Sequence, residues 1–93
     1  LKVPHMGWNN VEQKKDHTIW SKIPRTSFFY FVHSYYASAE SEEDISSTTT
    51  YDIDFTSSVI KDNIFACQFH PEKSSNYGLQ LISNFITWSE SLK

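Results

Sequence analysis

The chain has 93 residues, enough for one domain or for part of one but not for two. Hydrophobic residues make up 39% and charged residues 20%, a globular composition that excludes disorder over most of the length. The net charge of -3 argues against a nucleic-acid-binding surface, and no apolar run reaches the roughly 18 residues that a membrane-spanning helix needs. The single cysteine, Cys67, excludes an intrachain disulfide, and without a signal-peptide pattern we expect a cytoplasmic protein.

The N-terminal part of the chain contains little regular hydrophobic pattern. Residues 1–11 carry a proline and a glycine and predict an irregular segment that ends in a short strand. Residues 12–26 are polar and charged, and they predict a surface segment that Trp20 and Ile23 anchor to the body of the protein.

Strand patterns dominate the middle of the chain. Residues 27–36 (SFFYFVHSYY) carry apolar and aromatic side chains at both odd and even positions, which predicts a strand buried on both faces. Residues 37–47 predict an acidic, solvated loop. Two further strand patterns follow at residues 48–51 and 55–60, and an Asp-Asn turn signal stands at residues 62–63.

The last third combines one more strand with a helix. Residues 64–70 (IFACQFH) predict a buried strand that ends at Pro71, because proline donates no backbone hydrogen bond. Four apolar residues then recur at helical spacing: Leu79, Ile82, Phe85 and Ile86. They predict a helix over residues 76–91, and strands followed by a helix indicate an α/β or α+β fold.

The candidate site is a histidine and a glutamate at the end of the last strand. His70 and Glu72 lie two positions apart, and in extended backbone such residues point to the same side. A carboxylate on one imidazole nitrogen holds the tautomer that lets the other nitrogen accept a proton, and a thiol beside such a pair becomes reactive. The spacing alone also fits a strand-end histidine with a solvated neighbour.

Three stretches resemble one enzyme family. Residues 68–74 (QFHPEKS) resemble the C-terminal triad motif of class I glutamine amidotransferases. Residues 4–9 (PHMGWN) and 29–36 (FYFVHSYY) resemble the glutaminase subunits of imidazole glycerol phosphate synthases, which act in histidine biosynthesis. The resemblance implies that residues 1–93 are the C-terminal portion of an amidotransferase domain, with an α/β fold of largely mixed or antiparallel strands and a C-terminal helix.

The resemblance also implies a chemistry and a partner. Family members hydrolyse glutamine through a Cys-His-Glu triad and pass the ammonia to a (β/α)8-barrel synthase subunit in a heterodimer, without a metal or organic cofactor. By this resemblance His70 is the acid–base and Glu72 its orienting carboxylate. The residues expected beside bound glutamine are His33, Ser34 and Tyr35. Those expected at the synthase interface and ammonia gate are His5, Met6, Gly7, Trp8, Asn9, Tyr30 and Lys73.

Some expected features of the family are not in this sequence. The family carries its nucleophile on a glycine-flanked turn, whereas the glycines here are Gly7 and Gly78. Cys67 lies an odd number of positions before His70, which predicts a structural core cysteine that faces away from the histidine. We therefore expect the isolated chain to be inactive and to begin inside a longer gene product, since it opens on Leu1.

Two other functions stay open from the sequence. Family members usually carry Gly-Val where this chain has Ala66 and Cys67, and a glycine near the position of Asp52 and Ile53. These departures leave room for an amidotransferase subunit that serves another acceptor, such as a surface-polysaccharide sugar, or for a truncated protein that only binds a partner. His33 also fits a core position, His17 is expected on the surface, and the histidines show no metal-ligand spacing.

Overall fold

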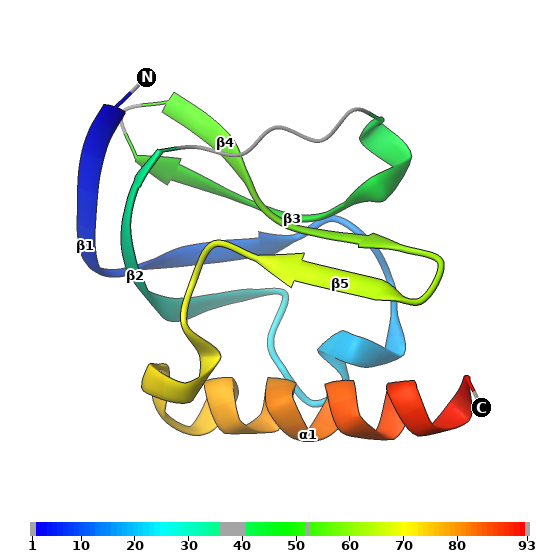
Figure 1. The fold of residues 1–93 in the computed structure, drawn as a ribbon. Helices are drawn as coiled ribbons and strands as arrows, with labels where there is room; N and C mark the ends of the chain where they lie inside the picture. The colour runs from blue at the N-terminus through cyan, green and yellow to red at the C-terminus, as the bar shows by residue number, and fades with distance from the viewer. Residues whose placement is uncertain (1, 36–40, 52, 93) are drawn as a thin grey trace.

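The structure, a computed structural model, describes residues 2–35, 41–51 and 53–92, with the backbone alone at residues 2–5 and 32–35 (Figure 1). The elements in chain order are β1 (Lys2–Gln13), η1 (Thr18–Trp20), β2 (Thr26–Tyr35), η2 (Glu42–Asp44), β3 (Ile45–Tyr51), β4 (Ile53–Lys61), β5 (Ile64–Cys67), η3 (Pro71–Lys73) and α1 (Ser75–Ser91). Within the described residues, five antiparallel strands form one sheet in the order β2-β1-β3-β4-β5, and α1 lies along one side of it. The predicted strands and C-terminal helix are confirmed. The acidic loop predicted for residues 37–47 is described only from residue 41, where it forms η2 and the start of β3.

Strand β1 is longer than the sequence predicts. It pairs with β2 from Glu12 opposite Thr26 to Lys2 opposite Tyr35, with one irregularity near its start. Gly7 has a φ of 121°, a backbone conformation that glycine adopts at little cost. The prediction of an irregular segment is therefore wrong over these residues, because pairing with β2 supplies hydrogen bonds that local sequence does not reveal.

Strand β2 is buried on one face, not on two. Phe29 and Phe31 are fully buried, whereas Phe28 is 56% exposed. The alternation of buried and exposed positions is that of a sheet with one solvated face. The prediction of burial on both faces is wrong here, because aromatic side chains also occur on outward faces.

Strand β5 likewise has an exposed face. Ile64 is 62% exposed and Ala66 is also exposed, while Phe65 and Cys67 pack against the hydrophobic core. The predicted turn before this strand is present, and Asp62 has the positive φ of 54° that such turns need. The prediction of a buried strand over residues 64–70 is thus correct for one face and for a shorter span.

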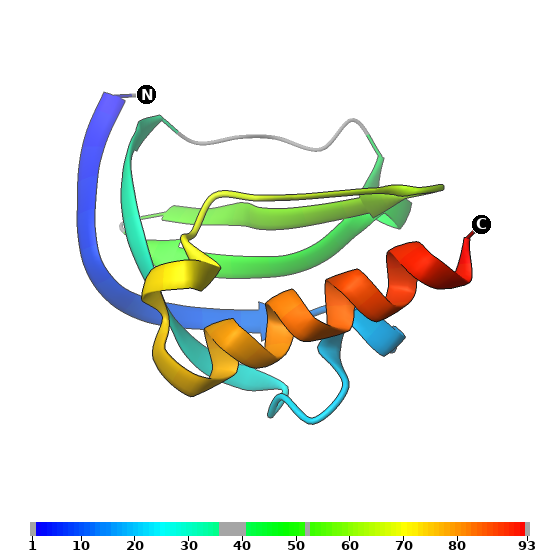
Figure 2. The ribbon, with the colours of Figure 1, turned by 60° about the horizontal axis from the view of Figure 1, so that its bottom comes forward.

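The sheet curls until the chain after its last strand meets its first. Within the described residues, β3 pairs with β1 over a short stretch, with Glu12 opposite Thr48 and Gln13 opposite Ser47. After β5, Phe69 forms an isolated antiparallel bridge with Phe31 of β2. Figure 2 shows the resulting curved sheet, with the connection from β5 to α1 beside β2. The candidate site lies on this connection.

The core of the described residues lies between the sheet, η1 and α1. Its buried apolar members are Val11, Ile19, Trp20, Ile23, Phe29, Phe31, Phe55, Ile60, Phe69, Leu81 and Trp88. Trp20 and Ile23 anchor the segment between β1 and β2, as predicted. Three buried serines lie next to this core: Ser46, Ser47 and Ser57. The Trp20 Nε1–H donates to Ser46 Oγ at 2.8 Å, and the Ser47 and Ser57 hydroxyls hydrogen-bond to each other. These hydroxyls can be buried because each has a hydrogen-bond partner.

Helix α1 spans almost the predicted residues but turns a different face inward. Its buried residues are Gly78, Leu81 and Trp88, whereas Leu79 and Ile86 are 60% and 53% exposed. Asn84 explains this orientation, since its Nδ2 donates to the Ile19 and Ser21 carbonyls of the η1 segment at 2.9 and 2.7 Å. The apolar pattern that predicted the helix therefore includes residues outside the buried face.

Candidate active site

His70 is held at the point where the chain leaves the sheet. Its backbone N–H donates to the carbonyl of Tyr30 in β2 at 2.8 Å, and it stands at the N-cap of η3. Pro71 occupies the first turn of η3, where its missing N–H needs no partner. Residues 70–72 therefore form the start of a helical turn and not the extended backbone assumed from the sequence.

The His70 and Glu72 side chains meet across this turn. His70 Nδ1 lies 3.1 Å from Glu72 Oε2, with the side chains 39% and 58% exposed. The hydrogen bond from His70 is the largest cause that lowers the pKa of Glu72 from its ordinary 4.5, and the positive charge of Lys73 adds to it. The ionised carboxylate only accepts hydrogen bonds, so Nδ1 carries the proton and Nε2 is left to accept one. This is the arrangement that general-base chemistry at a thiol requires.

Ser74 and Gly78 pack η3 tightly against the start of α1. The Gly78 N–H donates to the Ser74 carbonyl at 3.1 Å, and Ser74 is buried. A Cβ at Gly78 would lie only 2.0 Å from the Pro71 carbonyl oxygen. A glycine is therefore required at this position for the site turn to approach the helix.

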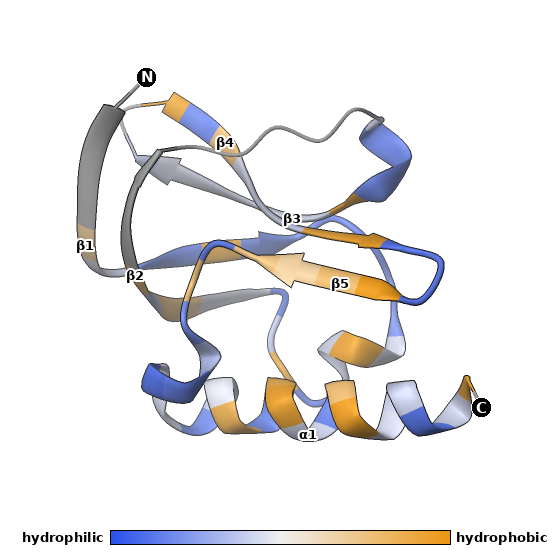
Figure 3. Cartoon of the chain, viewed as in Figure 1, coloured by the Kyte–Doolittle hydropathy of each residue, from blue (hydrophilic) through white to orange (hydrophobic). Residues whose placement is uncertain are grey.

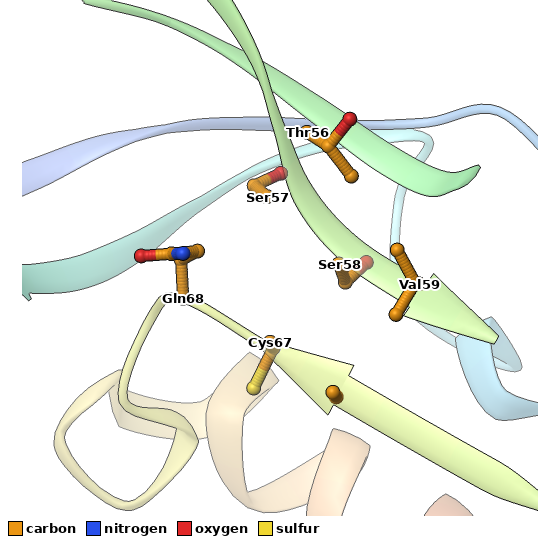
Figure 4. A pocket seen from close by; sticks show the side chains of 7 residues that line it. Thr56, Ser57, Ser58, Val59, Cys67 and Gln68 are labelled. Atoms are coloured by element: carbon orange, nitrogen blue, oxygen red, sulfur yellow. The ribbon is translucent and has the colours of Figure 1, made fainter. Parts of the chain in front are cut away.

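Cys67 faces the helical layer, where burial disfavours ionisation of its thiol and raises its pKa. Burial, with a smaller contribution from the charge of Glu72, raises the pKa of Cys67 from 9.0 to about 12. Its Sγ–H donates to the Phe69 carbonyl at 3.4 Å. Figure 4 shows the side chain extending from β5 toward the helix, at the side of a small pocket of about 100 Å³ that Ser57 and Gln68 also line. A thiol this hard to ionise is a poor nucleophile, which supports the interpretation of Cys67 as structural.

Some of the residues predicted at the partner interface share an outward face of the β1–β2 pair. Met6 and Trp8 are 73% and 49% exposed, and the rings of Trp8 and Tyr30 pack edge to face with centroids 5.9 Å apart. Lys73 is also exposed, on η3. These four residues are available to a partner.

The remaining predicted interface residues are not brought to that face. Asn9 lies on the opposite side of β1, where its Nδ2 donates to the Thr50 carbonyl at 3.0 Å. Gly7 contributes no side chain, and that of His5 lies outside the described part of the chain.

A pocket joins the outward face to the site turn, and the sequence did not reveal it. It has a volume of about 510 Å³ and lies between the β1–β2 pair and the start of α1. Its walls include Trp8, Phe28, Ser74 and Tyr77. Of these only Trp8 had been predicted as a site residue, although Ser74 closes the QFHPEKS motif.

Comparison with known proteins identifies the family. The glutamine amidotransferase class-I family matches residues 1–88. The chain belongs to this family. It is 53% identical over 89 residues to the imidazole glycerol phosphate synthase subunit HisH of Nitrosococcus oceani, and 49% identical over 89 residues to that of Nitrosomonas europaea. The predicted resemblance is thus confirmed.

The matched relatives are much longer than this chain. The alignments cover 96% of the chain but only 43% and 42% of the two HisH subunits, so the chain spans less than half the length of the curated relatives it matches. The crystal structure of a putative GMP synthase component from Thermoplasma acidophilum has the same fold. It superposes with a TM-score of 0.78 at 21% identity, over 98% of this chain and 48% of that chain.

The residues expected beside bound glutamine are placed only by their backbone. His33, Ser34 and Tyr35 lie near the end of β2, and His33 pairs with His5 across the two strands. Their side chains lie outside the described part of the chain, so their expected contact with glutamine stays a prediction.

The described residues hold neither a metal-binding cluster nor a membrane-spanning helix. No group of three or more His, Cys, Asp or Glu side chains is arranged to hold a metal ion within that part of the chain. Over the same residues, no helix has the length and apolar character to cross a membrane.

Proposed function

We propose that this chain supplies the histidine and the glutamate of a Cys-His-Glu triad in the glutaminase subunit of imidazole glycerol phosphate synthase, in histidine biosynthesis. The observation that carries the proposal is the 3.1 Å contact between His70 Nδ1 and Glu72 Oε2 on the turn after β5. Membership of the amidotransferase family and about 50% identity to HisH subunits support the choice of reaction.

The proposed mechanism uses His70 as base and then as acid. Nε2 takes the proton of a cysteine thiol, and the thiolate attacks the side-chain amide carbon of glutamine. His70 returns the proton to the departing nitrogen, which leaves as ammonia, and water then hydrolyses the thioester to glutamate. Glu72 keeps Nδ1 protonated and stabilises the imidazolium that forms in each step. No metal or organic cofactor takes part.

The nucleophilic cysteine has to come from polypeptide outside residues 1–93. Cys67 does not fit the role, because burial keeps its thiol protonated. We propose that residues 1–93 are one portion of an amidotransferase domain whose remainder carries the nucleophile. The relatives' length supports this, since the chain accounts for only 42–43% of them.

The ammonia produced passes, in this proposal, to a (β/α)8-barrel synthase subunit in a heterodimer. The outward residues Met6, Trp8, Tyr30 and Lys73 form the surface we assign to that contact. Two exposed apolar side chains and an aromatic pair are typical of interface anchors.

Replacement of His70 by alanine tests the proposed function. In the glutaminase assembled with its synthase partner, His70→Ala should lower glutamine hydrolysis by several orders of magnitude, because triad members act as a unit. Ammonia release measured with the partner present reports the effect. Cys67→Ala is the matched control and should leave the rate within a few-fold. Near-normal turnover of His70→Ala would refute the role, and ammonia incorporated into a different acceptor would refute the histidine pathway.

A further inference from the structure

Ser74 occupies an unusual position directly behind the catalytic turn. It is 1% exposed and stands between η3 and α1. As the N-cap of α1, a serine usually accepts a hydrogen bond from an N–H in the first helical turn. The Ser74 side chain makes no such bond, so its hydroxyl is free to bond to other groups.

The Ser74 hydroxyl connects two segments of backbone. Its Oγ accepts the N–H of Tyr30 at 2.9 Å and donates its own proton to the carbonyl of His70. The third side of the ring is the bond from the His70 N–H to the Tyr30 carbonyl at 2.8 Å. We name these three hydrogen bonds among Tyr30, His70 and Ser74 the Ser74 clasp.

The clasp satisfies a strand edge that would otherwise be open. Tyr30 stands opposite Trp8 of β1, yet its N–H and carbonyl both bond to the site turn and therefore point away from β1. β2 is the outermost strand on this side of the sheet, where unpaired N–H and carbonyl groups would face outward. His70 and Ser74 take both groups, so the backbone of the turn is docked onto β2.

We propose that Ser74 is a positioning residue for His70: by linking the His70 carbonyl to the Tyr30 N–H, its hydroxyl fixes the turn to β2 and sets the direction of the imidazole. This inference rests on the proposed function. The His70 side chain is 39% exposed and has Glu72 as its polar contact, so packing alone does not determine its direction. A displacement of about 1 Å at a reacting group lowers a rate roughly a hundredfold, and a base on a turn is correspondingly sensitive to its backbone anchor.

A spectroscopic experiment tests the clasp without any activity. The glutaminase subunit, in complex with its synthase partner, is labelled with nitrogen-15, and the tautomer of neutral His70 is read from its ring nitrogens. In the unmodified chain His70 should be the Nδ1–H tautomer, held by Glu72. In Ser74→Ala it should become a mixture of the two tautomers, because the turn loses an anchor. Ser83→Ala, the same change at an exposed position of α1, should behave as the unmodified chain. An unchanged Nδ1–H tautomer in Ser74→Ala overturns the proposal.

A second measurement needs no variant and covers the case in which Ser74→Ala does not fold. The Tyr30 amide at the edge of β2 should exchange slowly with solvent, because the Ser74 hydroxyl accepts it. Exchange as fast as that of a solvent-exposed amide would show that the clasp does not form, and would overturn the proposal.

Kinetics in the assembled glutaminase separate positioning from binding. Ser74→Ala should lower kcat roughly ten- to a hundredfold while KM for glutamine changes much less, because a displaced base affects the transition state. If His70→Ala abolishes turnover and Ser74→Ala does not change kcat, the inference about Ser74 fails and the proposed function stands. If His70→Ala retains turnover, the proposed function fails whatever the tautomer measurement gives.

Discussion

At the scale of single residues, His17 links the β1–β2 connection to the end of α1. Its Nδ1 accepts the Ile19 N–H at 3.0 Å, and its ring packs edge to face on Trp88 with centroids 5.5 Å apart. Burial, followed by the charge of Lys15, lowers the pKa of His17 from 6.5. The expectation of a plain surface histidine is therefore wrong, because the side chain caps η1 and is partly covered.

This histidine should make the stability of the chain depend on pH. The folded pKa lies below the unfolded 6.5, so the unfolded chain binds more protons between the two values. The stability that neutral His17 contributes to the fold is therefore fully present above pH 6.5 and is lost as the pH falls toward the folded pKa. Urea denaturation at about pH 7.5 and about pH 5.5 should show lower stability at the acidic value. His17→Gln should reduce this difference, and an equal difference in the variant would contradict the assignment.

At the scale of elements, the packing of α1 against η3 sets how closely the turn that carries His70 approaches the helix. The closest approach is at Gly78, where an added Cβ would meet the Pro71 carbonyl oxygen and the Ser74 Cβ, at 2.0 and 2.7 Å. The first of these is a backbone atom, which cannot move without shifting the turn that carries His70. The helix and the site turn are thus coupled at Gly78.

Gly78→Ala should consequently destabilise the chain, although alanine favours helices. Overpacking at such a contact costs about 1–3 kcal/mol, and here it exceeds the gain in helix propensity of about 1 kcal/mol. The midpoint of urea denaturation measures the effect. Ser83→Ala on the exposed side of α1 is the control and should leave the midpoint unchanged or slightly raised. A Gly78→Ala chain as stable as the unmodified one would show that the turn can move away from the added methyl group without cost, and would contradict this prediction.

At the scale of the whole molecule, two sets of exposed apolar side chains have no cover within the described residues. Leu79 and Ile86 lie on the outer face of α1 at 60% and 53% exposure, and Ile64, at 62%, lies at the start of β5 on the face of the sheet away from α1. Figure 3 shows hydrophobic residues recurring along the helix and on β5. β5 is also the outermost strand on its side of the sheet. Exposed apolar side chains of this kind fit the proposal that residues 1–93 are one portion of a larger domain.

We expect the isolated chain to self-associate through the exposed face of α1 and the open edge of β5, because open strand edges and exposed apolar patches favour aggregation. The combined change Leu79→Glu and Ile86→Glu should raise the monomer fraction in sedimentation velocity. Thr87→Glu adds one negative charge at an exposed polar position of the helix without removing an apolar side chain; it is the control and should have little effect. A monodisperse monomer of the unmodified chain would count against the fragment proposal.

The sequence was informative where the relevant signal is local. The HPE spacing predicted the pairing of His70 and Glu72, and the structure brings these side chains together at 3.1 Å. It does so through the 3-10 turn η3, not through extended backbone, because Pro71 starts a helical turn there. The clasp at Ser74 was not predictable, since its partner Tyr30 is 44 residues away in sequence.

Sequence alone determined the family, the identity of the His–Glu pair and the position of α1, because motifs and periodic patterns depend on neighbouring residues. Tertiary structure decided which faces of β2, β5 and α1 are buried. It also decided that the turn after β5 docks onto β2. Burial and docking depend on what lies opposite a residue in space, and a curled sheet brings together segments whose separation along the chain carries no local signal.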